Sequence, residues 1–151
     1  MAALPGAVLF ACNFNRVRSP MAEALMQLAF GTRVFVDSVG LRREAGQSGA
    51  DPFAAAVMDE LGADLSGFRP KTFDELEDES FDLVVSLTPE AHHRAVELAR
   101  GRAVDIEYWP TMDPTLTSGS REQVLEAYRQ VRDGLASRIR DRFGKASTFG
   151  G

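Results

Sequence analysis

Cys12 is the only cysteine of this 151-residue chain, and Arg18 and Ser19 follow it after five intervening residues. The cysteine ends an apolar run, AVLFA, and a predicted helix begins at Ser19-Pro20. A thiolate is a strong nucleophile, and a helix start offers unpaired N–H groups and positive dipole character to an anion. The segment therefore predicts a loop that binds a phosphate-like oxyanion above a nucleophilic thiol.

Each residue of this loop has a candidate role in phosphoryl chemistry. Cys12 would attack, Arg18 would grip two oxygens with its planar guanidinium, and Ser19 would donate a hydrogen bond to the thiolate. Backbone N–H groups of residues 13–18 would ring the anion, which gives these candidate substrate-binding residues: Asn13, Phe14, Asn15, Arg16 and Val17. Asn15 suits a tight position with positive φ. A lone cysteine beside a strand is also often a buried hydrophobe, so the surrounding elements must decide.

Those elements alternate along the chain as strands and helices, which predicts an α/β fold with a doubly wound parallel sheet. Apolar runs predict strands at 7–11, 33–37, 81–86 and 104–109, and helical periodicity predicts helices at 19–30, 52–62, 90–100 and 120–143. Ser19 resembles a helix N-cap followed by a first-turn proline. Ligands of such folds bind beyond the carboxyl ends of the strands. Cys12 and Asp113 both follow strands there, so they are predicted to share one edge.

The loop CNFNRVRS, preceded by an apolar strand and followed by PMAEAL, resembles that of the low-molecular-weight protein tyrosine phosphatases, which have C-x5-R-S. Arsenate reductases share this loop and fold. Weaker matches follow in the family's order: Gly40 in VDSVG, Asp51-Pro52, LSGFRPK, FDLVVS and WPTMDPT. The resemblance implies a flavodoxin-like sheet of order 2-1-3-4, no metal or cofactor, and a cysteinyl-phosphate intermediate. It also implies that Cys12, Arg18, Ser19 and Asp113 are catalytic, with Asp113 as general acid and then base.

Several positions depart from the family pattern. Thr115 stands where an aromatic residue usually follows Asp113-Pro114, and Glu44 stands where a tryptophan is common. Less stacking area for a phenyl ring is therefore expected, with Phe14 and Trp109 as possible substitutes. Phe68 and Thr88 replace a histidine and an aspartate together. Val17 replaces a second loop cysteine, so no loop disulfide can protect Cys12.

Length and composition indicate a single domain over residues 1–144 with a flexible tail at 145–151. The net charge of −5 argues against nucleic acid as a partner, and no apolar run approaches membrane-spanning length. With one cysteine and no convincing signal peptide, a cytoplasmic location is expected. The expected state is a monomer or weak dimer. His92 and His93 are interpreted as a solvated helix face rather than metal ligands.

The function predicted by these observations is hydrolysis of a phosphomonoester, carried by a phosphorylated protein or a small molecule. Inorganic phosphate or another oxyanion is the expected ligand of the loop. One alternative is an arsenate reductase, which would need an external thiol such as glutathione or mycothiol because the chain has no second cysteine. Another is a module that binds phosphate or a phosphoprotein with weak turnover. Arg42 and Arg43 are a further candidate contact for an anionic substrate.

Overall fold

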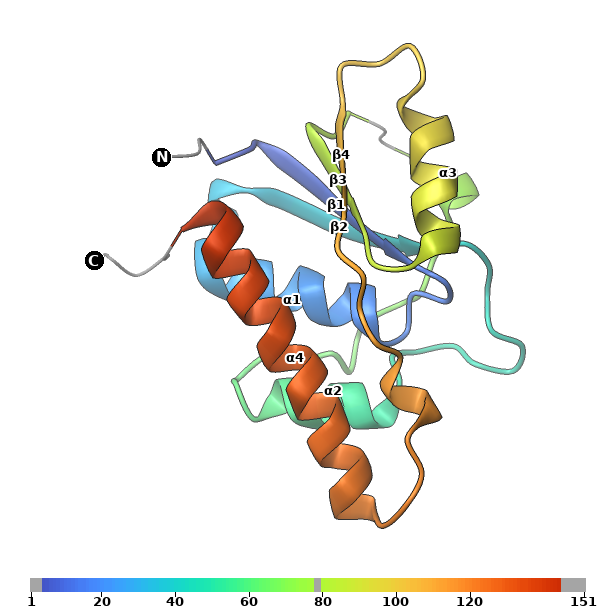
Figure 1. Cartoon of the computed structure of the whole chain (residues 1–151), viewed down its shortest axis with the longest axis vertical. Helices are drawn as coiled ribbons and strands as arrows, with labels where there is room; N and C mark the ends of the chain where they lie inside the picture. The colour runs from blue at the N-terminus through green and yellow to red at the C-terminus, as the bar shows by residue number, and fades with distance from the viewer. Residues whose placement is uncertain (1–3, 78–79, 145–151) are drawn as a thin grey trace.

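Four parallel strands form the centre of the computed structural model, which describes residues 4–77 and 80–144. They are β1 (Ala7–Cys12), β2 (Phe35–Gly40), β3 (Leu83–Ser86) and β4 (Asp105–Tyr108). Their order is β2-β1-β3-β4, as Figure 1 shows, which confirms the predicted order and fold class. The predicted tail at 145–151 lies outside the described residues.

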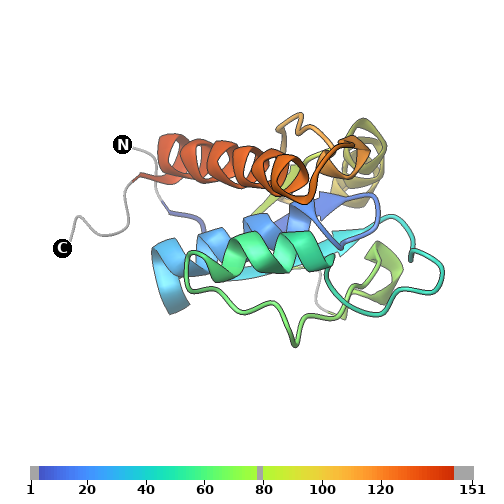
Figure 2. The ribbon, with the colours of Figure 1, turned by 90° about the horizontal axis from the view of Figure 1, so that it is seen from below.

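Helices cover both faces of this sheet. The helices are α1 (Arg18–Phe30), α2 (Pro52–Asp59), α3 (Pro89–Ala99) and α4 (Arg121–Phe143). Helices α1, α2 and α4 lie together on one side, whereas α3 lies on the other (Figures 1 and 2). Each face of the sheet has its own hydrophobic core: the first lies under α1, α2 and α4, and the second lies under α3. Successive side chains of β1 enter these cores in turn, with Val8 and Phe10 in the first and Leu9 and Ala11 in the second. Burial on both faces explains why β1 is apolar throughout rather than alternating.

Some predicted boundaries were wrong, each for a physical reason. The second strand was predicted at 33–37, but it runs from Phe35 to Gly40, because Asp37 pairs with Lys71 at a partly buried position and Ser38 is hydrogen-bonded in the interior. The first helix begins at Arg18 with Val17 as its N-cap, so Ser19 is not the cap. Its side chain instead contacts Cys12.

The prediction of a solvated histidine pair was wrong for His92. Its ring stacks on Tyr108 of β4, with centroids 5.0 Å apart, and its Nδ1 atom is buried. His93 is exposed as expected. Within the described part of the chain, no helix is long and apolar enough to cross a membrane.

Candidate active site

The loop between β1 and α1, residues 13–17, lies at the carboxyl end of β1. Asn15 has φ of 58°, the only positive value at a described residue other than glycine, as the sequence predicts for a tight loop. Gly40, beside Cys12 in the parallel register, lies under the loop without a side chain. Among the described residues, no backbone carbonyl outside the helix and strand ladders accepts a hydrogen bond from the N–H groups of residues 14–18, as expected for donors that surround an anion.

A chain of hydrogen bonds runs from Cys12 into the protein interior. The Asn15 side chain is fully buried, and its Nδ2 donates both hydrogens, to Ser19 Oγ at 2.8 Å and to Ser38 Oγ at 2.9 Å. Ser38 Oγ in turn donates to Glu23 Oε1 at 2.6 Å. Burial raises the pKa of Glu23. The network thus fixes both serines as acceptors from Asn15.

This direction of donation matters for the nucleophile. Ser19 already accepts from Asn15, so its own hydrogen is available to Cys12 Sγ at 2.9 Å or to the Val39 carbonyl oxygen at 3.3 Å. A thiolate carries no proton, so Ser19 must be the donor whenever Cys12 is ionised. The arrangement can therefore stabilise negative charge on Sγ, which is the role proposed for Ser19 from the sequence.

Arg18 connects the loop to the segment after β4. Its Nη1 donates to the Thr111 carbonyl oxygen at 2.9 Å, and its Nη2 lies 3.8 Å from Asp113 Oδ2. The Arg18 side chain is largely buried, and its bond to Thr111 orients the guanidinium toward the cavity side that also carries Asp113. Two predicted catalytic residues that are distant in sequence, Arg18 and Asp113, are thereby neighbours.

Asp113 is oriented by Thr115, a role that the sequence did not indicate for this residue. Its Oδ1 accepts hydrogen bonds from Thr115 N at 3.0 Å and Thr115 Oγ1 at 2.7 Å. The second oxygen, Oδ2, is the one beside Arg18. At the position where an aromatic side chain was expected, Thr115 therefore provides a hydroxyl that orients the candidate acid. An Asp-x-Thr sequence can form this contact as a local turn.

These side chains surround a cavity of about 180 Å³. The residues that line it are Cys12, Phe14, Arg16, Val17, Arg18, Glu44, Asp51, Asp113 and Thr115. Of the predicted substrate-binding residues, Phe14, Arg16 and Val17 line the cavity. Asn13 does not, because its Oδ1 accepts from Thr88 Oγ1 at 2.7 Å. The Asn15 side chain is bonded to Ser19 and Ser38, so neither asparagine side chain lines the cavity.

The cavity wall carries an ion pair. Arg16 Nη1 contacts Glu44 Oε1 at 2.8 Å, and Arg16 Nε donates to the Gly49 carbonyl oxygen at 2.9 Å. Arg16 is thus paired with Glu44 in the cavity wall. Arg42 lies over the Phe14 ring, 5.3 Å from its centroid. Arg43, which follows Arg42 in the sequence, forms an ion pair with Glu75.

Two other positions that depart from the family pattern have separate roles. Thr88 caps α3 by accepting from Ala91 N at 3.0 Å, in addition to its bond with Asn13. Phe68 packs against the first hydrophobic core. Among the described residues, no group of three or more His, Cys, Asp or Glu side chains is arranged to hold a metal ion.

Known proteins resemble this chain over nearly its whole length. An arsenate reductase of Halalkalibacterium halodurans is 31% identical over 133 residues, covering 88% of this chain and 91% of that protein. A glutaredoxin arsenate reductase of Synechocystis sp. is 29% identical over 140 residues, covering 93% of this chain and 98% of that protein.

Solved structures of both enzyme types share the fold. An arsenate reductase in a phosphate-binding state superposes with a TM-score of 0.74 at 28% identity, covering 93% of this chain and 98% of that one. A low-molecular-weight protein tyrosine phosphatase from T. tengcongensis gives 0.72 at 27% identity, covering 90% and 95%. A family model described as low molecular weight phosphotyrosine protein phosphatase matches residues 7–145. The chain therefore belongs to the low-molecular-weight phosphotyrosine protein phosphatase family.

Proposed function

We propose that this protein hydrolyses phosphomonoesters through a cysteinyl-phosphate intermediate. The observation that carries the proposal is that Cys12, Arg18 and Asp113 line one cavity, with Ser19 bonded to the nucleophile from behind. A nucleophile, a cation and a carboxylate around one anion-sized space are the groups that metal-free phosphoryl transfer requires.

In the first step, Cys12 Sγ forms a bond to phosphorus as the bond to the leaving oxygen breaks. Asp113 donates its proton to that oxygen, through Oδ2, since Thr115 occupies Oδ1. Arg18 and the loop N–H groups hold the equatorial oxygens, where charge is greatest in the transition state. Arg18 requires little reorganisation because Thr111 already orients it.

In the second step, water attacks the phosphocysteine and the Sγ–P bond breaks. The Asp113 carboxylate accepts the proton from water, and the hydroxyl of Ser19 stabilises the thiolate that departs. Inorganic phosphate leaves, and Asp113 is again protonated for the next cycle. One carboxyl group thus serves as acid and then as base.

The substrate we propose is a phosphorylated protein, with small phosphomonoesters as simpler substrates. Phe14 supplies one aromatic surface beside the cavity, whereas Thr115 and Glu44 supply polar ones. Selectivity for phosphotyrosine is therefore expected to be weaker than two aromatic walls would give.

Arsenate reduction is the second candidate, because relatives at 27–31% identity are named arsenate reductases. Cys12 would attack arsenate in the same loop, and the two electrons would come from two thiols. The chain holds a single cysteine, so an external thiol such as glutathione or mycothiol must supply the second. A protein that binds phosphate or a phosphoprotein with weak turnover is the remaining alternative.

Hydrolysis of p-nitrophenyl phosphate without added metal tests the proposal. We expect turnover by the wild type, loss of turnover in Cys12→Ser, and a decrease of roughly 10²–10⁴-fold in Asp113→Asn. Binding of phosphate or vanadate without turnover would support the binding module instead. Thiol-dependent loss of arsenate with negligible phosphatase activity would support the reductase.

We further infer a cytoplasmic protein that is a monomer or weak dimer, is organised as one domain over residues 1–144, and acts without nucleic acid or membrane partners. The net charge of −5 supports the absence of nucleic acid. Light scattering after gel filtration tests the oligomeric state, and a stable tetramer would contradict it.

A further inference from the structure

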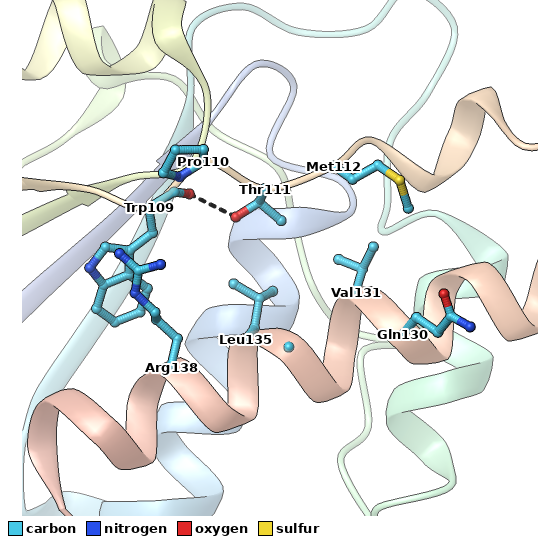
Figure 3. Close-up of a pocket in the computed structure, with 9 residues that line it drawn as sticks. Trp109, Pro110, Thr111, Met112, Gln130, Val131, Leu135 and Arg138 are labelled. Carbon is cyan, nitrogen blue, oxygen red and sulfur yellow. Dashed lines mark hydrogen bonds between the residues drawn. The ribbon is translucent and has the colours of Figure 1, made fainter.

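A second cavity, of about 250 Å³, lies beside the active site between α4 and the segment that follows β4. Figure 3 shows Trp109 to Met112 along one side and Val131, Leu135 and Arg138 of α4 along the other. Trp109, Val131 and Leu135 are buried residues that contribute their outer surfaces to its floor. The floor is therefore apolar, and its size suits one side chain or a small ligand rather than a large cofactor.

A glycine on α4 keeps this cavity open. Gly134 lies in the interior of the helix and lines the cavity, and a Cβ atom placed on it would meet nothing within 4 Å. Glycine is a poor residue for a helix interior, and neither a positive φ nor a close contact requires it here. The residue therefore weakens the helix while leaving space at the cavity.

One end of the cavity is positively charged. The Arg138 guanidinium is exposed and lies over the Trp109 ring, 5.3 Å from its centroid. Among residues 4–77 and 80–144, no carboxylate lies within ion-pair distance of Arg138, in contrast to the nearby Arg142, which bonds to Glu107 at 2.7 Å. An occupant with an apolar body and an adjacent negative charge would complement this end.

The cavity is continuous with the catalytic segment. Thr111 lines it and also accepts the hydrogen bond from Arg18. Met112, 60% exposed, lies between Thr111 and the candidate acid Asp113, and Leu116, 83% exposed, follows shortly after. Exposed apolar side chains thus stand on both sides of Asp113 in the segment that joins the two cavities.

From this continuity we infer that the second cavity is a docking site for the phosphorylated protein, and the inference rests on the function proposed above. The phosphate would occupy the loop, and a neighbouring aliphatic side chain of the same polypeptide would enter the cavity over Met112. An acidic residue next to that side chain would pair with Arg138. Free arsenate is too small to reach both places, so this surface favours a polypeptide substrate.

Phosphotyrosine peptides test the inference directly, with p-nitrophenyl phosphate as the small-molecule control. In one series a Leu-Glu pair is moved through the positions on either side of phosphotyrosine, and a matched series carries Ala-Lys. At one spacing, kcat/KM for the Leu-Glu peptide should exceed kcat/KM for the Ala-Lys peptide of the same spacing by about 10-fold or more, because burial of the leucine alone contributes at least that factor.

Three variants test whether the preference for the Leu-Glu peptide depends on the second cavity. Gly134→Leu fills the cavity and should abolish the preference for Leu-Glu, while its better helix propensity keeps the unfolding temperature at or above that of the wild type. Arg138→Glu should reduce the preference for the Leu-Glu peptide over the Ala-Lys peptide, because the favourable charge pair becomes a repulsive one. Ser137→Leu adds the same bulk to an exposed position of α4 outside the cavity lining and should change nothing.

The outcomes separate the two claims. A preference that survives in Gly134→Leu, or no preference at any spacing, overturns the docking site provided that p-nitrophenyl phosphate is hydrolysed normally. Absence of p-nitrophenyl phosphate hydrolysis in the wild type overturns the proposed function, and the docking site with it.

Discussion

Gly40→Ala is the substitution that most directly tests how the sheet supports the phosphate loop. Gly40 ends β2 beside Cys12, and its N–H donates to the Lys71 carbonyl oxygen at 2.8 Å. A Cβ atom on Gly40 would lie 2.7 Å from Asn15 N, 2.7 Å from Phe14 C and 2.9 Å from Asn13 O. All three are backbone atoms of the loop, so no flexible side chain can move aside to make room.

The geometry sets the size of the effect. Ordinary contacts begin at 3.4 Å, so the loop must retreat by about 0.7 Å to accept a methyl group. A displacement approaching 1 Å among reacting groups costs about 10²-fold in rate, and overpacking costs about 1–3 kcal/mol of stability. We therefore expect kcat/KM for p-nitrophenyl phosphate to fall by about 10²-fold while the protein stays folded.

Gly67→Ala is the matched control, because a methyl group there meets nothing within 4 Å and Gly67 has no positive φ. Steady-state kinetics and thermal unfolding of the two variants provide the comparison. The control should retain wild-type activity. Activity in Gly40→Ala within about twofold of the wild type would refute the argument that the bare end of β2 holds the loop in its catalytic geometry.

Three further predictions concern the acid and two carboxylates. Thr115→Val removes the hydroxyl donor to Asp113 and should lower kcat for phenyl phosphate by about 10-fold, whereas Thr115→Ser should retain it; equal kinetics of the two variants would contradict this role. Burial raises the pKa of Glu23, so its contribution to stability is present at low pH and lost as pH rises above about 4.5. Between about pH 4 and 7, the unfolding temperature of Glu23→Gln should therefore rise relative to that of the wild type, and a constant difference between the two would contradict this prediction. Hydrogen bonds, first from Arg129, lower the pKa of Glu60 to about 2, so its contribution to stability is present above about pH 4.5 and lost as pH falls toward 2. Glu60→Gln should therefore unfold at a lower temperature than the wild type at neutral pH, with the smallest difference in high salt. A difference that persists at pH 2 would contradict this prediction.

The fold was largely predictable because its signals are local. Continuous apolar runs identify strands buried on both faces, and β1 and β3 are of this kind. The end of β2 was not predictable in the same way, because Asp37 and Ser38 look like the polar start of a loop. Their burial depends on Lys71 and Asn15, and such distant partners leave no mark in a local pattern.

The residues of the site were likewise easier to predict when they lie close together in the sequence. Cys12, Arg18 and Ser19 are close in sequence, so their spacing alone indicates one loop. Asp113 joins them through Arg18 across the sheet edge, as the shared carboxyl ends of the strands predict.

Partners within the site were less accessible to sequence reasoning. The bond between Arg16 and Glu44 joins two loops whose relative position depends on the whole fold. The hydroxyl of Thr115 was overlooked because the position was compared for its missing aromatic ring rather than for its hydrogen-bonding group.

Detection of phosphate on Cys12 tests the central claim most directly. In Asp113→Asn, p-nitrophenolate can leave without an acid, but no carboxylate remains to activate water, so the phosphocysteine should accumulate. Rapid acid quenching followed by mass spectrometry should find one phosphoryl group on the peptide that contains Cys12, and none in Cys12→Ser. Turnover of p-nitrophenyl phosphate by the wild type, with no phosphoryl group on Cys12 in the quenched variant, would contradict the account.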